Sequence, residues 1–232
     1  MYNMNIKNLG ICFSGSLRAL EYTLDNIYNK LIEPNKNKYK IVVFLYIPND
    51  QHKNKIKLLN KLNIELKYEI KDDIELKLPN INWNNFLLKI KNNKCAIQGY
   101  LQQLYGIGKS FELLKNYEKN NNMKFDIICR TRSDVMYINN IDIDSFDINK
   151  ITIPNFHGYS GINDRFAIGN RANMKVYMEM YSNLTKLNNF EMFWQAELYC
   201  KYNLEINNIN YIKNNSIQFK RVRENGEISN DV

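Results

Sequence analysis

The sequence predicts an α/β fold in which helices cover both faces of a mostly parallel central sheet. Short apolar runs of strand length alternate with longer amphipathic stretches over residues 1–130. That alternation is typical of parallel strands joined by helical crossovers. A chain of 232 residues is long enough for one such domain with a full core. No internal repeat or linker interrupts it, so we expect a single domain over residues 1–232.

The first elements follow one another closely. Residues 8–13 form an apolar run of strand length, and the turn Ser14-Gly15-Ser16 comes next. Apolar residues then recur every three or four positions over residues 17–32, which predicts an amphipathic helix that Pro34 ends. Residues 39–47 predict a second buried strand.

The next stretch is basic at first and then becomes helical. Residues 51–62 predict a short basic helix, and residues 64–70 alternate apolar and polar side chains as a strand does. Residues 71–94 carry no clear pattern. Residues 95–118 place their apolar side chains on one stripe, which predicts a helix. Its three glycines each cost about 1 kcal/mol relative to alanine, and we expect them to allow close contact with another backbone.

The second half of the chain supplies shorter elements. Asn170 is a suitable N-cap for the helix that follows it. We expect the tail after Glu224 to be frayed. The predicted strands are residues 125–130, 151–154, 164–169 (strand or extended loop), 206–212 and 217–221, and the predicted helices are residues 171–187 and 191–201.

The charge of the chain points to an anionic ligand, although only in part. The net charge is +8, from 32 basic and 24 acidic residues. Lysine is abundant together with Asn and Ile, as AT-rich codons would specify, so we give more weight to the clustered arginines. They form the pairs Arg130 with Arg132, Arg165 with Arg171, and Arg221 with Arg223. No basic stripe with interleaved aromatic residues stands out, so we expect no nucleic-acid partner.

Two absences in the sequence bear on location. No stretch approaches the roughly 20 apolar residues of a membrane helix, and the longest apolar run covers only residues 41–47. The N-terminus lacks the apolar core of a signal peptide. We therefore expect a cytoplasmic protein without a membrane span.

The turn after the first strand is the first candidate site. A strand, a glycine turn and a helix start place unpaired N–H groups where a phosphate can bind. Ser14, Ser16 and Arg18 would add hydroxyl and guanidinium donors. The spacing is neither GxxxxGK[ST] nor GxGxxG, which weakens a phosphate- or sulfate-transferring alternative. An ordinary turn with a serine N-cap explains the residues equally well.

The second candidate is the charged end of the strand at residues 125–130. Arg130, Arg132 and Asp134 follow directly on apolar residues, and ligands of open α/β sheets bind beyond the carboxyl ends of the strands. A carboxylate there can hold Mg²⁺ or Mn²⁺, and arginines can neutralise a diphosphate. The alternative is a structural ion pair between arginine and aspartate.

The third and fourth candidates are acidic residues in the second half. Asp164 lies in a glycine-containing loop and could act as a general base, or serve as a turn residue paired with Arg165. His157 in that loop is more simply a hydrogen-bonded loop residue. Glu197 lies on a predicted helix and could line an acceptor site or face solvent. Other possible donors to a sugar or base are Gln98, Gln102 and Gln103.

Together, the segments FSGSLRA, FDIICRTRSDV and IPNFHGYSGINDRFAIG resemble GT-A glycosyltransferases, above all the small enzymes of giant viruses and of bacterial surface-polysaccharide clusters. The likeness spans residues 8–223, and R-x-R-x-D and N-D-R-F-A-I-G are its specific parts. It implies a Rossmann-like nucleotide-binding half (residues 1–135) and an acceptor-binding half (residues 136–223), followed by the tail at 224–232. It also implies sugar transfer from a nucleoside-diphosphate sugar, with UDP favoured, to a hydroxyl of a glycan or glycoconjugate.

The resemblance also assigns roles to individual residues. Asp134 matches the last aspartate of the family's D-x-D metal motif, which implies Mn²⁺ or Mg²⁺. Arg132 stands where the first aspartate would be, so Arg130 and Arg132 could instead replace part of the metal's charge. Of the two, we favour a metal-assisted enzyme. Asp164 and Glu197 match recurrent acids of the acceptor side. The residues implied to contact the nucleotide are Phe13, Ser14, Gly15 and Arg18, with Arg130, Arg132 and Asp134 at the diphosphate.

Two functional hypotheses follow. In an inverting glycosyltransferase, which we favour, Asp164 or Glu197 deprotonates the acceptor hydroxyl, whereas a retaining route needs no such base. The alternative is a non-catalytic protein that binds a nucleotide or glycan with the same fold. The sequence leaves the oligomeric state open.

Overall fold

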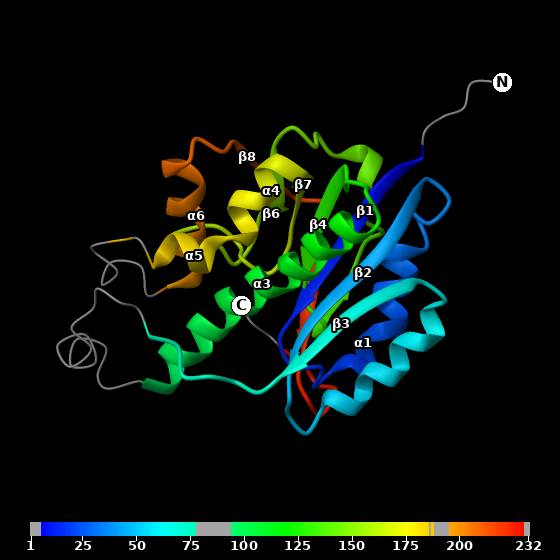
Figure 1. Cartoon of the computed structure of the whole chain (residues 1–232), viewed down its shortest axis with the longest axis horizontal. Coiled ribbons are helices and arrows are strands. Elements are labelled where there is room, and N and C mark those ends of the chain that lie inside the picture. Colours follow the sequence, from blue (N-terminus) through cyan, green and yellow to red (C-terminus); the bar gives the residue numbers. More distant parts are fainter. Residues whose placement is uncertain (1–5, 78–93, 186, 188–194, 230–232) are drawn as a thin grey trace.

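The structure is a computed structural model that describes residues 6–77, 94–185, 187 and 195–229 (Figure 1). Within these residues, a seven-stranded sheet has the order β3-β2-β1-β4-β7-β6-β8. β3, β2, β1 and β4 are mutually parallel, β7 is antiparallel to both its neighbours, and β6 and β8 are parallel. The strands are β1 (Lys7–Ser14), β2 (Tyr39–Pro48), β3 (Glu65–Lys71), β4 (Ile127–Thr131), β6 (Ile151–Pro154), β7 (Ala167–Asn170) and β8 (Tyr211–Asn214).

Helices cover both faces of this sheet, as the sequence predicted (Figure 1). In β2, Val42 and Phe44 pack toward α3, whereas Val43 and Leu45 pack toward α1, because successive side chains of a strand point to opposite faces. One face carries α1 (Leu20–Ile27), η1 (Tyr28–Ile32) and η2 (Lys53–Leu62), and the other carries α3 (Lys94–Asn120), α4 (Arg171–Met178), α5 (Met180–Leu184) and α6 (Ala196–Ile206). A short helical turn, η3 (Ile143–Ser145), precedes β6. No helix in the described part of the chain is both long and apolar enough to cross a membrane.

A second sheet brings the end of the chain back to β4. It contains β5 (Val135–Tyr137), β9 (Phe219–Val222) and β10 (Ile228–Ser229) in the antiparallel order β10-β9-β5. The Val222 amide donates to the Asp134 carbonyl over 2.9 Å. We did not predict β5, and the tail that we expected to be frayed from residue 224 is paired at 228–229, while residues 230–232 lie outside the described residues.

Several predicted boundaries are wrong for local reasons. The first helix begins at Leu20 rather than residue 17, and its N-cap is Ala19, without a side-chain capping bond. The serine N-cap alternative is therefore wrong. α6 continues to Ile206, so the strand predicted at 206–212 begins only at Tyr211. The helix predicted at 171–187 is divided at Glu179, and the start of that predicted at 191–201 lies outside the described residues.

α3 and α4 are joined through a buried carboxylate. Arg171 donates two hydrogen bonds of 2.6 Å to Glu118, and the Phe125 amide donates a third over 3.1 Å. Burial alone would raise the pKa of Glu118, but Arg171 and the Phe125 amide outweigh that effect and lower it. The Asn170 side chain accepts from the Asn173 amide over 2.9 Å and caps α4, which confirms the predicted N-cap.

Candidate active site

A cleft of about 450 Å³ lies at the carboxyl ends of β1, β2 and β4. Such crevices are where open parallel sheets bind ligands. Its walls are formed by the turn after β1, the ends of β2 and β3, the middle of α3 and the segment after β4. The polar residues that line it are Ser14, Ser16, Arg18, Asp50, Asp73, Gln102, Gln103, Arg132, Ser133 and Asp134.

The glycine turn forms one wall of the cleft. Gly15 has a φ of 103°, a left-handed conformation that favours glycine, and its amide donates to the Tyr46 carbonyl over 3.1 Å. Gly106 of α3 lies against this turn, since a Cβ there would lie 3.3 Å from the Ser14 Cβ. Within the described residues, the Ser16 Oγ atom is buried without a hydrogen-bond partner. A ligand in the cleft could satisfy that hydroxyl.

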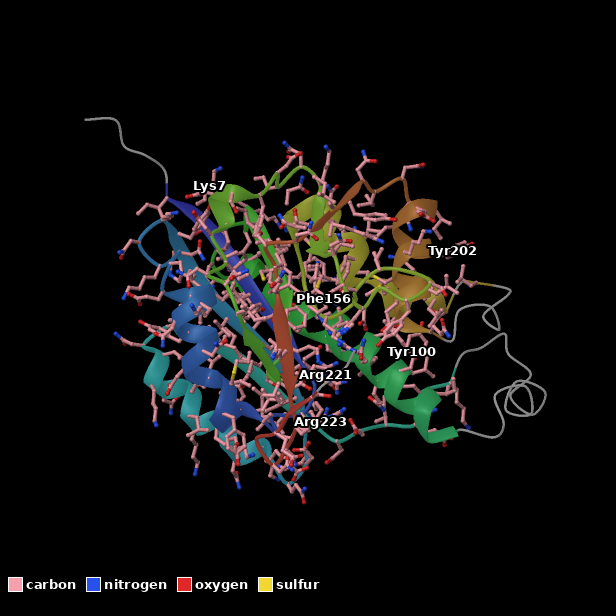
Figure 2. All side chains as sticks on the ribbon, turned by 180° about the vertical axis from the view of Figure 1, so that it is seen from behind. Lys7, Tyr100, Phe156, Tyr202, Arg221 and Arg223 are labelled. Atoms are coloured by element: carbon pink, nitrogen blue, oxygen red, sulfur yellow. The ribbon has the colours of Figure 1, made fainter. Side chains whose placement is uncertain are left out.

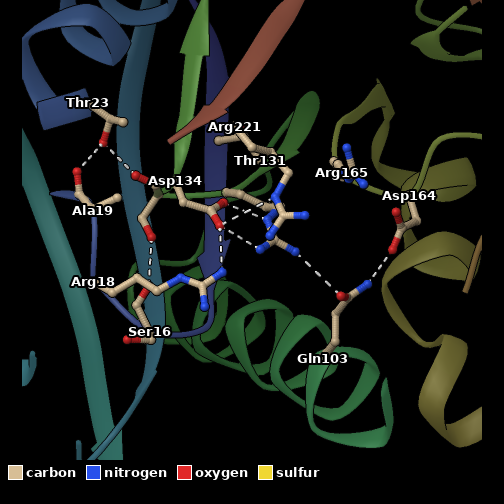
Figure 3. Close-up of polar contacts among 12 residues, drawn as sticks. Ser16, Arg18, Ala19, Thr23, Gln103, Thr131, Asp134, Asp164, Arg165 and Arg221 are labelled. Carbon is tan, nitrogen blue, oxygen red and sulfur yellow. Dashed lines mark hydrogen bonds and ion pairs between the residues drawn. The ribbon is translucent and has the colours of Figure 1, made fainter. Parts of the chain in front are cut away.

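Asp134 is the centre of an arginine cluster, which we define as Arg18, Arg132 and Arg221 (Figure 3). Arg132 donates to both carboxylate oxygens, from Nε over 2.7 Å and from Nη2 over 2.8 Å. Arg18 donates from Nη2 over 3.3 Å, and the Arg221 Nε atom lies 3.9 Å from Oδ2. Burial would raise the pKa of Asp134, but Arg132, then Arg221 and Arg18, hold it well below its usual range. One carboxylate faces three guanidinium groups, so the cluster carries a net positive charge.

Three different parts of the fold position this cluster. Arg18 comes from the turn after β1, Asp134 from the segment between β4 and β5, and Arg221 from β9. Hydrogen bonds fix the first two segments together: Thr23 Oγ1 donates to the Ser133 carbonyl over 2.6 Å, and Ser133 Oγ donates to the Ser16 carbonyl over 2.9 Å. Figure 2 shows Arg221 and Arg223 on the β9 segment, seen from behind.

Gln103 of α3 links the arginine cluster to Asp164 (Figure 3). Its Oε1 atom accepts from Arg132 over 3.5 Å, and its Nε2 atom donates to the Asp164 carboxylate. The Asp164 backbone is fixed as well, because its carbonyl accepts from Arg130 and from the Tyr177 hydroxyl over 3.1 Å. Asp164 therefore sits within one hydrogen-bonded chain that begins at Asp134.

Glu197 lies next to Asp164, in the first turn of α6. The loop before Asp164 packs directly on that turn: the Ile162 amide donates to the Glu197 carbonyl over 3.1 Å, and a Cβ on Gly161 would lie 2.0 Å from the same oxygen. Burial, followed by the charge of Asp164, raises the pKa of Glu197. A carboxylate with a raised pKa is suited to general base catalysis near neutral pH. The structure thus brings together the two acids that the sequence singled out.

Two of the residues predicted to contact the nucleotide do not line the cleft. Phe13 is 5% exposed and packs in the core on the α1 side. Arg130 is 1% exposed, and its Nη1 atom donates to the Asp164 carbonyl, so it supports the acid loop instead of facing the cleft. Both side chains belong to strands and point into the covering layers. Ser14, Gly15, Arg18, Arg132 and Asp134 do line the cleft.

The remaining candidates have structural contacts. The His157 Nδ1 atom lies 3.3 Å from an Arg165 nitrogen, and its ring contacts Phe156, which confirms the hydrogen-bonded loop residue. Gln98 bonds both backbone groups of Leu76, and Gln102 donates to the Ile74 carbonyl.

Sequence reasoning missed two features of the cleft. The arginine pair at 221 and 223 suggested anion binding, but nothing in the sequence indicated that β9 would place Arg221 beside Asp134. Asp50 and Asp73 also line the cleft. Burial, and then Asp50, raise the pKa of Asp73.

The donor set at Asp134 does not fit a divalent cation. Mn²⁺ and Mg²⁺ bind oxygen ligands that are free to coordinate, whereas both oxygens of this carboxylate already accept from guanidinium groups. In the described ranges, no group of three or more His, Cys, Asp or Glu side chains could hold a metal ion.

Comparisons with known proteins confirm the fold. The structure is similar to the crystal structure of core-mannan synthase A (CmsA/Ktr4) from Aspergillus fumigatus in its Mn/GDP form, with a TM-score of 0.56 and 10% identity over 97% of this chain and 77% of that one. The mostly parallel sheet flanked by helices is thus the GT-A fold that the sequence predicted. The likeness to enzymes of giant viruses and bacterial clusters stays a prediction.

No curated protein sequence matches the chain. The model of one protein family matches residues 4–222, nearly the whole sequence. The chain therefore belongs to the family described as a domain of unknown function, DUF7796.

Proposed function

We propose that this protein is a glycosyltransferase that moves a sugar from a nucleoside-diphosphate sugar to a hydroxyl of a glycan or glycoconjugate. One observation carries the proposal: a cleft lined by cationic side chains at the ends of parallel strands is linked, through Gln103, to the acid pair Asp164 and Glu197. The similar fungal synthase was solved with GDP, which supports a nucleoside diphosphate as the ligand.

The cleft has the size and the chemistry for such a donor. About 450 Å³ falls in the range of small-molecule sites. Arg18 and Arg132 line it and can donate charge-assisted hydrogen bonds to the diphosphate, and the buried Ser16 hydroxyl can add another. Asp50 and Asp73, which also line the cleft, can accept from the ribose or base. We retain UDP as the favoured nucleotide, to be tested against GDP.

The reaction follows from the placement of the acids. In the inverting route, the Glu197 carboxylate takes the proton of the acceptor hydroxyl while that oxygen bonds to the anomeric carbon. The bond from the anomeric carbon to the diphosphate breaks, and its electron pair leaves with the diphosphate. Arg18 and Arg132 stabilise the negative charge that develops there. Burial, and then the charge of Asp164, raise the pKa of Glu197, which makes Glu197 the better base.

The test is incubation with UDP-sugars and GDP-sugars, with a chromatographic assay of free nucleotide and product. We expect one donor to release nucleotide at a rate that increases with a hydroxyl acceptor. Arg132→Gln should abolish that release, and Arg223→Gln, which removes an exposed arginine outside the cleft, should not. Stabilisation by UDP or GDP without any turnover would instead establish the non-catalytic binder.

A further inference from the structure

We infer that the diphosphate is bound by the guanidinium groups of the arginine cluster, without a divalent cation. Asp134 would then be a positioning residue that holds those guanidinium groups in place. The inference rests on the proposed function, because it concerns how the same cleft binds its donor.

Asp134 and the arginines around it differ in exposure. The Asp134 side chain is 4% exposed, whereas those of Arg18 and Arg132 are 36% and 20% exposed. The carboxylate therefore contributes little surface to the cleft that it lines, and Arg18 and Arg132 offer an incoming ligand the larger exposed area. A metal bridge would require the reverse, with an accessible carboxylate oxygen.

The Arg132 guanidinium group is held in a fixed orientation. The paired bonds from Arg132 to Asp134 fix the guanidinium plane, and Gln103 accepts from a further nitrogen of the same group. Arginine has five N–H donors in a rigid fork whose geometry matches both carboxylate and phosphate groups. An arginine held in this way is pre-oriented and loses little freedom when it binds a phosphate.

The net charge around Asp134 is suited to a diphosphate. Three guanidinium groups around one carboxylate leave a positive excess. A nucleoside-diphosphate sugar carries one negative charge on each of its two phosphates, which matches that excess. A divalent cation would add positive charge to a cluster that is already cationic and would be repelled. The charge excess of the arginine cluster around Asp134 is thus balanced by the diphosphate.

The first experiment measures nucleotide affinity by calorimetry, with UDP and GDP in turn, in EDTA and in millimolar Mn²⁺. We expect the Kd of the nucleotide that binds to differ by less than threefold between the two conditions. Binding that weakens more than 30-fold in EDTA would overturn the inference and leave the proposed function standing. If neither nucleotide binds in either condition, both fail.

The second experiment compares variants in EDTA. Arg18→Gln should raise the nucleotide Kd at least tenfold, and Arg223→Gln should change it less than twofold. In Asp134→Asn, the uncompensated guanidinium groups gain more from the diphosphate, so the nucleotide should raise the Tm by more than it does in the unmodified protein. An equal or smaller Tm shift in Asp134→Asn contradicts the inference, because the uncompensated guanidinium groups would then gain nothing from the diphosphate. If Asp134→Asn does not fold, an unchanged Kd in Arg18→Gln contradicts it instead.

Discussion

Glu197→Gln is expected to stop proton transfer and to leave donor binding intact. Glutamine has nearly the same shape as glutamate, and the backbone bond from the Ile162 amide to the Glu197 carbonyl does not depend on the side chain. Glu197 does not line the donor cleft. The variant therefore separates the chemistry of the acid pair from the binding of the nucleotide.

The expected magnitude follows from the role of a positioned base. General base catalysis contributes about 10²- to 10⁴-fold to a rate, which corresponds to about 3–5 kcal/mol of transition-state stabilisation. We expect kcat to fall by that factor, and the nucleotide Kd to change by less than about twofold. Stability should not fall, because the substitution removes a partly buried charge that Asp164 repels.

The pH dependence of kcat/KM gives an independent check on Glu197 as the base. The base must be ionised, so kcat/KM should fall as the pH drops through the pKa of Glu197, and that limb should lie above the usual glutamate value of about 4.3. Asp164→Asn removes the neighbouring negative charge that helps to raise the pKa of Glu197. The acidic limb should therefore move to lower pH in that variant.

The assay is single-turnover sugar transfer from pH 4.5 to 8, together with calorimetric binding of the nucleotide and urea unfolding. A Glu197→Gln enzyme that keeps more than half of its single-turnover rate would refute the assignment of the base. An acidic limb that stays in place in Asp164→Asn would refute the coupling between the two acids.

Three further predictions test the surroundings of the site. Gly161→Ala should lower stability by about 1–3 kcal/mol and reduce transfer, because its Cβ would lie 2.0 Å from a backbone oxygen of α6; Gly108→Ala, with its nearest atom at 3.5 Å, is the control in thermal unfolding. Glu118→Gln should lower the free energy of unfolding in urea by about 3–5 kcal/mol. The pKa of Glu118 is lowered in the folded protein. The stability that its carboxylate confers is therefore present above the unfolded pKa of about 4.3 and is lost as the pH falls through the folded pKa. Gln103→Glu places a carboxylate against Asp164, so the acidic limb of transfer should move to higher pH, and an unchanged profile would contradict the proposed link.

The sequence was sufficient for the layers of the fold because those depend on local patterns. Continuous apolar runs such as residues 39–47 indicated buried strands, and the apolar stripe of residues 95–118 indicated the helix that covers them. Element boundaries were less predictable, because tertiary hydrogen bonds decide them. The helix after the first strand begins late since Ser16 and Ser133 tie the preceding turn to the segment after β4.

The candidate site was predictable where chemistry follows directly on a strand. Gly15, Arg132 and Asp134 could be recognised from their position after apolar residues, and all three line the cleft. Arg130 and Phe13 do not line the cleft because they are still within strands, where the pleat turns their side chains into the core. The place of Arg221 could not be predicted, since it depends on the pairing of β9 with β5 across a long stretch of sequence.

The pairing of β9 with β5 places Arg221 beside Asp134. It therefore affects the charge around Arg132, which stands where the D-x-D motif has its first aspartate. Arg132 alone would neutralise Asp134 and leave a neutral pair, with no net attraction for a diphosphate. Arg18 from the turn after β1 and Arg221 from β9 make the cluster cationic. Under the inference drawn above, an arginine in place of that carboxylate makes a phosphate site only because two other segments contribute charge. Removing Arg221 should accordingly weaken nucleotide binding even though it does not line the cleft, because its positive charge lies beside Asp134.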